Sequence, residues 1–288
     1  MGDSLVKILV RAIVALSLCS IGFAQLPEAG GLRGTAEQTT ALSKKNSIDA
    51  APRSPQADPG CSFLFTSGAN NTFLSYCLTT NGNVTQLITP AGHFQIVNPV
   101  EGYGFCDGFT GTEYFDYAFE DSLNWGPTTS SSPSATSKKF VRTTSDGLWT
   151  LTQTITQQAA TSSVKVVMTL KNNTSDNRPV LLVRYADVDV DGVLANNFDG
   201  TLNSAMAWNN FFSGAHPFGL VLQNVGTPPF PDFNGFAQTI PGVVHPCNPF
   251  ANVSRTVEVG VDGSLVMNYQ GTIPKKASKS FTISYKGL

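Results

Sequence analysis

The stretch Lys139–Thr156 reads KFVRTTSDGLWTLTQTIT and decides the fold class. Polar and apolar residues alternate on both sides of Asp146-Gly147, which is the period of a β-strand with one buried face. An Asp-Gly pair between two such segments is a strong hairpin signal, because these residues tolerate the positive φ of a tight turn. Trp149 and Leu151 share one face of the second arm, so we expect both in the core.

The rest of the chain repeats this pattern. Segments around Asn81-Gly82 (residues 72–89) and around Asp262-Gly263 (residues 255–270) predict two further hairpins. Single strands are expected at residues 61–66, 113–119, 163–171, 179–190, 218–224 and 279–286. We find no convincing amphipathic helix after the first residues. About a dozen short strands with Gly-containing turns predict an all-β protein, a large antiparallel β-sandwich.

Three parts are expected along the chain. Residues 1–24 have the layout of a secretory signal peptide, with basic residues, an apolar run too short to span a membrane, and a small-residue site ending at Ala24. Residues 25–60 have the composition of a disordered tail and contain no aromatic residue. Residues 61–288 are expected to form one β-sandwich domain. We therefore predict a secreted or periplasmic protein whose mature chain begins at Gln25.

Two segments interrupt the strand pattern. Residues 128–137 (TTSSSPSATS) are polar throughout and are expected to form a loop. Residues 227–250 are rich in proline and phenylalanine. A structureless loop of that length is often functional, whereas its phenylalanines would also suit a cover over a sheet face. The sequence leaves both interpretations of this longer loop open.

Charge is sparse, because only 13% of the residues are charged. Without the signal peptide, which holds Asp3, Lys7 and Arg11, 19 acidic and 16 basic residues remain, a net charge of −3. This balance gives no sign of a basic surface for nucleic acid or for an anionic membrane. We expect no nucleic-acid partner and no transmembrane segment.

Four cysteines remain after the signal peptide, and an even number in an exported protein favours two disulfides. Cys61 and Cys77 flank a turn centred near Ala69, so a hairpin would place them opposite each other at a separation that a disulfide accepts. We predict the pair Cys61–Cys77. The remaining pair, Cys106–Cys247, would then hold the proline-rich segment.

Four stretches together carry a resemblance: NGNVTQLITPAGHFQI (81–96), EGYGFCD (101–107), RTTSDGLWTLTQT (142–154) and RYADVDVDG (184–192). The chain resembles, over roughly residues 61–191, a group of secreted, uncharacterised bacterial all-β proteins. The resemblance implies an exported bacterial β protein and supplies no catalytic residues. More distantly, long strands such as VKVVMTLKNN look like those of galactose mutarotases and related carbohydrate enzymes, a likeness of fold that does not carry function.

Acidic residues near EGYGFCD are candidates for catalysis. Glu101 lies in that stretch, and Glu113 and Asp116 lie on the next expected strand. Two carboxyl groups a few ångströms apart suffice for glycoside hydrolysis, whereas surface charges and turn caps are the alternative interpretation. The three histidines lie far apart and show no metal-binding spacing. The sequence leaves open whether the protein is an enzyme.

Two tryptophans are candidates for ligand binding. Trp125 in NWGP and Trp208 in AWNN are the better surface candidates, and an exposed indole is a platform on which a sugar ring stacks. The alternative is burial, because most tryptophan area lies in protein cores.

The stretch ADVDVDG (186–192) places three carboxylates at alternate positions. In an extended strand, Asp187, Asp189 and Asp191 would point to the same side, about 6.6–7 Å apart. The string matches the first six positions of a calcium-binding EF-hand loop, but Phe198 stands where the closing Glu would be. We hypothesise a structural calcium site formed by these three residues and Asp199, with a solvated strand face as the alternative.

The sequence is best interpreted as a secreted β-sandwich protein of binding or structural type that recognises carbohydrate or cell-envelope material. The alternative is a polysaccharide-acting enzyme, glycosidase- or mutarotase-like, with a carboxylate pair among the three acidic candidates. An enzyme would show a deep cleft with two facing carboxyl groups, whereas a binding module would show a shallow face with coplanar exposed aromatic side chains.

Overall fold

A computed structural model describes residues 60–97, 100–209, 218–226, 234–240, 244–249 and 255–288. The predicted signal peptide and nearly all of the predicted tail lie outside these residues. Within the described ranges no helix has the length and apolarity needed to cross a membrane.

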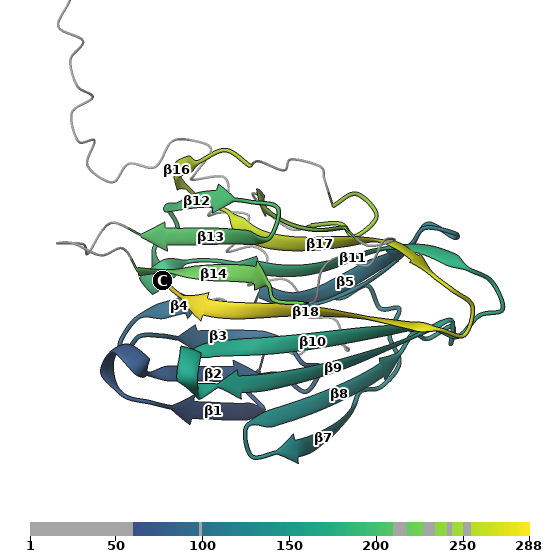
Figure 1. Cartoon of the computed structure of the whole chain (residues 1–288), viewed down its shortest axis with the longest axis horizontal. Coiled ribbons are helices and arrows are strands. Elements are labelled where there is room, and N and C mark those ends of the chain that lie inside the picture. The colour runs from purple at the N-terminus through teal and green to yellow at the C-terminus, as the bar shows by residue number, and fades with distance from the viewer. Residues whose placement is uncertain (1–59, 98–99, 210–217, 227–233, 241–243, 250–254) are drawn as a thin grey trace, which may run out of the picture.

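Eighteen strands in this part of the chain form three antiparallel sheets (Figure 1). The nine-stranded sheet has the order β16 (Glu258–Val261), β12 (Asn196–Gly200), β13 (Ser204–Asn209), β14 (Phe218–Asn224), β18 (Ser278–Gly287), β10 (Ser163–Asn172), β9 (Trp149–Gln158), β8 (Ser137–Thr143) and β7 (Thr129–Ser134). The five-stranded sheet has the order β15 (Asn234–Ile240), β17 (Ser264–Ile273), β11 (Arg178–Asp187), β5 (Val100–Asp107) and β6 (Thr112–Ala118). The four-stranded sheet runs β1 (Phe63–Ser67), β2 (Leu74–Leu78), β3 (Val84–Ile88) and β4 (Phe94–Ile96). The described residues also contain three short 3₁₀ turns: η1 (Asn70–Thr72), η2 (Ala159–Thr161) and η3 (Val190–Gly192).

The nine-stranded sheet forms one layer of a sandwich, and the other two sheets form the second layer (Figure 1). One core cluster joins the layers, because it contains alternate residues of β10, such as Val166 and Met168, together with Leu182 of β11 and Tyr76 of β2. A smaller cluster covers the other side of the five-stranded sheet, where Val244 packs. The prediction of an all-β antiparallel sandwich is confirmed.

Two predicted hairpins are confirmed. Strands β2 and β3 flank Asn81-Gly82, and β8 and β9 flank Asp146-Gly147, whose glycine has a φ of 72°. Trp149 and Leu151 are buried as expected.

The third predicted hairpin is wrong. Although β16 and β17 are separated only by Asp262-Gly263, β16 pairs with β12 in the nine-stranded sheet, whereas β17 pairs with β11 and β15 in the other layer. The Asp-Gly pair therefore makes a corner between the layers. Both edges of β17 are occupied by β11 and β15, so neither is left for β16, which lies at the edge of the other layer with Val259 largely exposed.

Both expected loops contain strands. Within residues 128–137, β7 pairs with β8 through its backbone, although all its side chains are exposed. Within residues 227–250, β15 forms the edge of the five-stranded sheet beside β17. An edge strand pairs through its backbone groups and does not require alternating apolar residues. Such a strand therefore cannot be recognised from its side-chain pattern.

Both predicted disulfides are present. The Cα atoms are 5.3 Å apart in Cys61–Cys77 and 4.8 Å apart in Cys106–Cys247. The expected register of the first pair is wrong, because Leu64 lies opposite Cys77 and Cys61 precedes β1. The bond therefore joins the incoming chain to β2 and does not cross directly opposed strand positions.

Candidate functional site

Glu101 is completely buried between the layers and belongs to an ion pair. Its Oε1 accepts a hydrogen bond from Arg184 Nε at 2.6 Å and another from the Tyr285 hydroxyl, and its Oε2 accepts from the backbone N–H of Val84 at 2.5 Å. Burial raises the pKa of this carboxyl, and the charge and hydrogen bonds of Arg184 act in the opposite direction. Arg184 Nη1 also donates to Gln153 Oε1 at 2.6 Å, which ties β11 to β9 across the sandwich.

Asp116 is the centre of a second buried network. Arg142 Nη1 lies 2.5 Å from its Oδ2, and Asn81 Nδ2 donates to the same oxygen at 3.0 Å. Asn83 Nδ2 donates to Asp116 Oδ1 at 3.1 Å and to the carbonyl of Glu101 at 3.0 Å, so the two networks share a residue. Burial raises the pKa of Asp116, whereas Arg142 lowers it.

The expected carboxylate pair is therefore not an accessible one. Glu101 and Asp116 are both fully buried and are each held by an arginine. Glu113, on β6, is partly exposed and accepts hydrogen bonds from the backbone N–H of Cys247 at 2.8 Å and from His245 Nδ1 at 3.2 Å. A general acid or base must reach its substrate, and neither buried carboxylate does so in this structure.

The tryptophan candidates differ in position. Trp125 is only 2% exposed; its Nε1 donates to the carbonyl of Phe115, and its ring packs edge-on against Phe105. The interpretation of Trp125 as a surface platform is therefore wrong, because NWGP turns its indole into an aromatic cluster. Trp208 lies partly buried on β13, opposite Asn197 of β12.

The expected row of carboxylates in ADVDVDG is broken by the end of the strand. Strand β11 stops at Asp187, and Asp191 adopts a left-handed φ of 55°. Asp191 Oδ2 lies 3.0 Å from His93 Nδ1, and its Oδ1 accepts from the backbone N–H of Phe94. Asp199 bonds the N–H of the next residue, Gly200. The expected four-residue set is thus not brought together.

A different acidic cluster forms instead. One carboxylate oxygen from each of Asp187, Asp189 and Asp262 lies within 4.8 Å of the other two. Asp262 comes from the corner between β16 and β17, and the register that sets Asp187 opposite Ser264 brings it here. Sequence reasoning missed Asp262, because it placed this residue in a hairpin turn. Three oxygen ligands from carboxylates match the ligand preference of Ca²⁺.

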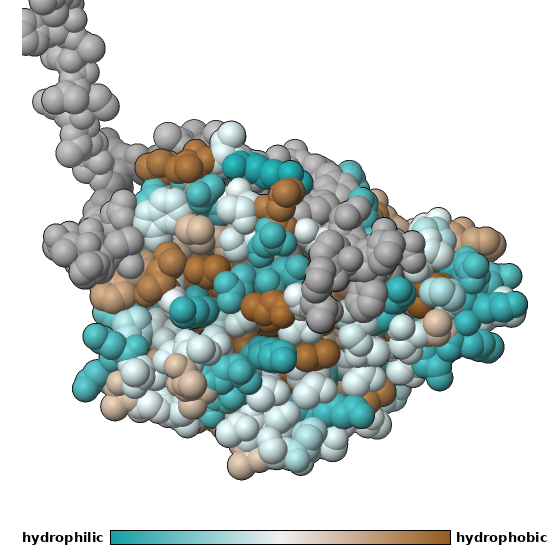
Figure 2. All heavy atoms as spheres, in the orientation of Figure 1, coloured by the Kyte–Doolittle hydropathy of each residue, from teal (hydrophilic) through white to brown (hydrophobic). Residues whose placement is uncertain are grey.

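A polar groove of about 320 Å³ lies on the outer face of the nine-stranded sheet. Its lining comes from β9, β10, β14 and β18 and the turns beside them, and includes Gln158, Ser163, Lys165, Gln223, Ser284 and Lys286. Strand alternation explains this composition, because the residues between them on β10 and β18, Val164 and Tyr285, point into the core. Figure 2 shows this face as mostly pale or teal over these strands.

This groove has no signature in the sequence. It is formed by single residues from strands that are far apart in the chain: Lys165 of β10 lies opposite Ser284 of β18, which lies opposite Gln223 of β14. Only the order of the strands in the sheet brings them together.

Comparison with known proteins adds evidence on the fold. No protein-family model and no curated protein sequence matches the chain. A bacterial glucoamylase solved in complex with acarbose superposes with a TM-score of 0.50 at 13% identity, covering 82% of this chain and 34% of the glucoamylase. This likeness shows a shared β-sandwich fold, and the chain spans about a third of the glucoamylase's length.

Two further structures are smaller proteins that the chain matches along nearly their whole length. A galactose mutarotase-like protein from Lactobacillus casei gives a TM-score of 0.44 at 10% identity, covering 78% of this chain and 100% of that protein. An aldose epimerase homologue from C. elegans gives 0.41 at 11% identity, covering 78% and 99%.

Proposed function

We propose that this chain is an exported carbohydrate-binding protein and that the groove on the nine-stranded sheet holds the glycan. The observation that carries the proposal is the lining of the groove. Amide, hydroxyl and ammonium groups converge there, and these are the groups that hydrogen-bond sugar hydroxyls. The glucoamylase that shares the fold was solved with acarbose, which supports a carbohydrate ligand.

Binding is favoured over glycoside hydrolysis by the position of the carboxylates. Among the described residues, none that lines the groove is an aspartate or a glutamate. Glu101 and Asp116 are buried in ion pairs between the two layers, on the side of the nine-stranded sheet that faces away from the groove. A retaining or inverting glycosidase needs two carboxyl groups beside the scissile bond, and the lining residues that the structure describes supply neither.

A glycan array probed with the mature protein tests this proposal. We expect binding to a defined set of glycans and a loss of at least tenfold in affinity for Gln158→Ala/Gln223→Ala, because both amides line the groove. The matched control is Gln86→Ala/Gln270→Ala, which removes two partly buried glutamines from strands of the second layer. Unchanged binding of the groove variant, or absence of binding to any glycan, would contradict the proposal.

Export forms part of the same proposal and rests on the signal-peptide pattern. The protein would act in the periplasm or outside the cell, where its ligand is glycan or cell-envelope material. Mass spectrometry of the protein recovered from the periplasm or the medium should give a chain beginning at Gln25. A chain recovered only from the cytoplasm with residues 1–24 attached would refute export.

A second candidate function is calcium binding at Asp187, Asp189 and Asp262. Like charges 4.8 Å apart repel by roughly 3–4 kcal/mol per pair at an effective dielectric near 20, so a bound cation would stabilise this corner. We expect calcium to raise the melting temperature relative to chelator in the wild-type protein and in Asp199→Asn, but not in Asp189→Asn. Equal melting temperatures of the wild type with calcium and with chelator would reject the site.

A further inference from the structure

Acidic and basic residues are segregated on the nine-stranded sheet. Seven contiguous strands, from β13 through β14, β18, β10, β9 and β8 to β7, contain no aspartate or glutamate. The whole chain nevertheless has more acidic than basic residues, 20 against 18. The net charge of the chain is slightly negative, but seven of the nine strands in this sheet contain no acidic residue.

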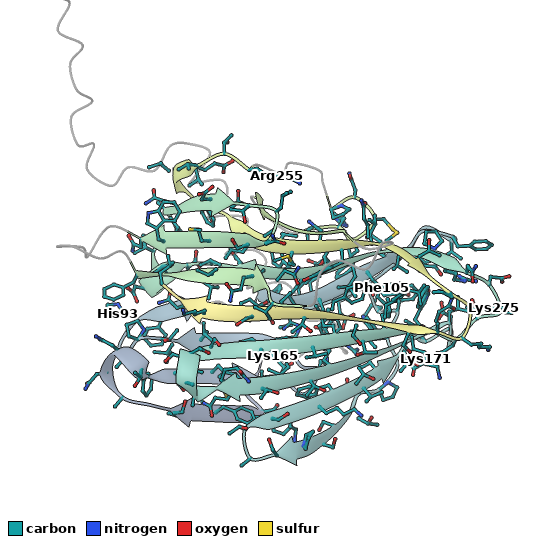
Figure 3. The ribbon with its side chains drawn as sticks, viewed as in Figure 1. His93, Phe105, Lys165, Lys171, Arg255 and Lys275 are labelled. Atoms are coloured by element: carbon teal, nitrogen blue, oxygen red, sulfur yellow. A yellow bond between two sulfur atoms is a disulfide. The ribbon has the colours of Figure 1, made fainter. Side chains whose placement is uncertain are left out.

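Four lysines project from the outer face of these strands. On β10, Val164, Val166 and Met168 point into the core, so Lys165 and Lys171 point outward. Figure 3 shows these two lysines along β10 on the sheet that faces the viewer. The register adds two others to the same face: Lys139 of β8 and Lys286 of β18.

Two of these lysines meet in the groove. Lys165 is opposite Ser284, and Lys286 is opposite Ser163, so they are diagonal neighbours on adjacent strands. Residues in that relation lie about 7–8 Å apart at their Cα atoms. Within the described residues, no hydrogen bond or ion pair engages either ammonium group. The groove thus presents two positive charges, and no carboxylate belongs to the part of its lining that the structure describes.

We propose that the groove binds an anionic glycan, one whose sugars carry carboxylate or sulfate groups, with an anionic group placed between Lys165 and Lys286. This inference rests on the proposed function and names its ligand class. An anion between the two ammonium groups relieves their mutual repulsion and forms charge-assisted hydrogen bonds. Gln158, Gln223 and Ser284 then contact the sugar hydroxyls that flank the anionic group.

The lining also favours a glycan over a nucleic acid. Proteins that bind single strands place aromatic rings where bases stack, and none of the described residues that line the groove is aromatic. The neutral residues described in the lining carry hydroxyl and amide groups, apart from the apolar Val225. These groups suit the hydroxyl-rich edges of sugars.

Binding of the mature protein to immobilised polygalacturonate, sulfated dextran and neutral dextran at low and high salt tests the inference. We expect one or both anionic polymers to bind, with weaker binding at high salt, and neutral dextran not to bind. Lys165→Gln/Lys286→Gln should lower the affinity at least tenfold and flatten the salt dependence. The matched control, Lys275→Gln/Lys276→Gln, removes the same charge from the turn before β18 and should leave binding unchanged; Figure 3 shows Lys275 at the far end of the sheet. A melting temperature equal to that of the wild type establishes that each variant is folded.

The outcomes separate this inference from the proposed function. Binding of neutral glycans through the groove without binding of either anionic polymer would overturn the inference and leave carbohydrate binding intact. Absence of binding to every glycan would overturn both. Duplex DNA bound as tightly as the anionic polymers, with the same loss in the Lys165→Gln/Lys286→Gln variant, would show a general polyanion surface and overturn the assignment to a glycan.

Discussion

At the residue scale, the interior is held by three arginine–carboxylate pairs: Arg184–Glu101, Arg142–Asp116 and Arg178–Asp107. Sequence reasoning selected Glu101 and Asp116 as chemically notable but could not assign their role. Their arginine partners are 83 and 26 residues away in the chain. Pairing over such distances cannot be predicted from the residues on either side of each carboxylate. Trp149 was assigned to the core because alternation marks it, whereas Trp125 lies in a turn where alternation gives no direction.

Removing one partner of the Glu101 pair should be costly. In Glu101→Gln the guanidinium of Arg184 stays buried without its counter-charge, so we expect a loss of about 3–5 kcal/mol in the free energy of unfolding. The double variant Glu101→Gln/Arg184→Met removes that charge as well and should recover part of the loss. Urea denaturation measures both; a double variant less stable than the single one would show that the pair is not the main contribution of Arg184.

Asp146 provides a pH-dependent prediction. Burial raises its pKa, but hydrogen bonds from Thr144, Tyr114 and the backbone N–H of Leu148 outweigh this, so the pKa lies below its usual value. A carboxyl with a lowered folded pKa contributes stability above its unfolded pKa and loses that contribution as the pH falls through the folded value. Asp146→Asn should therefore lower the melting temperature near pH 7, and the difference should shrink below about pH 4. A difference that is constant between pH 7 and pH 3 would contradict this assignment.

At the element scale, strands with alternating side chains were predictable and those without were not. The hairpins at Asn81-Gly82 and Asp146-Gly147 follow from alternation and turn chemistry. Asp262-Gly263 has the same local signal but connects two layers, because the apolar residues of β17 pair with β11 and leave β16 at an exposed edge. The corner that results places Asp262 in the acidic cluster, so the error in topology also hid a candidate ligand.

The two disulfides should differ in their contribution to stability. Cys61–Cys77 spans 16 residues, and Cys106–Cys247 spans 141. Chain-entropy estimates give about 3 kcal/mol for the shorter loop and about 5 kcal/mol for the longer one. We expect Cys106→Ser/Cys247→Ser to lower the free energy of unfolding by about 2 kcal/mol more than Cys61→Ser/Cys77→Ser. Equal losses in urea denaturation would show that native contacts, and not loop closure, govern the difference.

At the scale of the whole molecule, strand alternation and turn residues predicted the fold class, but the sequence did not predict the distribution of charge on the surface. The net charge is a sum over the whole chain. It therefore does not show that the strand order gathers lysines on one sheet and leaves most of its strands without acidic residues. Lys165 and Lys286 are separated by more than a hundred residues and become neighbours only because β10 and β18 pair. A surface of this kind is a property of topology, and the sequence pattern alone does not reveal it.

The position of β18 also has a consequence for the order of events in folding. This strand is the last in the sequence, yet it lies in the interior of the nine-stranded sheet, between β14 and β10. During synthesis both neighbours are complete long before β18 leaves the ribosome, so the sheet remains in two unjoined halves. Folding governed by such distant pairing is slow. The nine-stranded sheet therefore cannot be completed before β18, which begins more than a hundred residues after β10 ends, is available to pair with both of its neighbours.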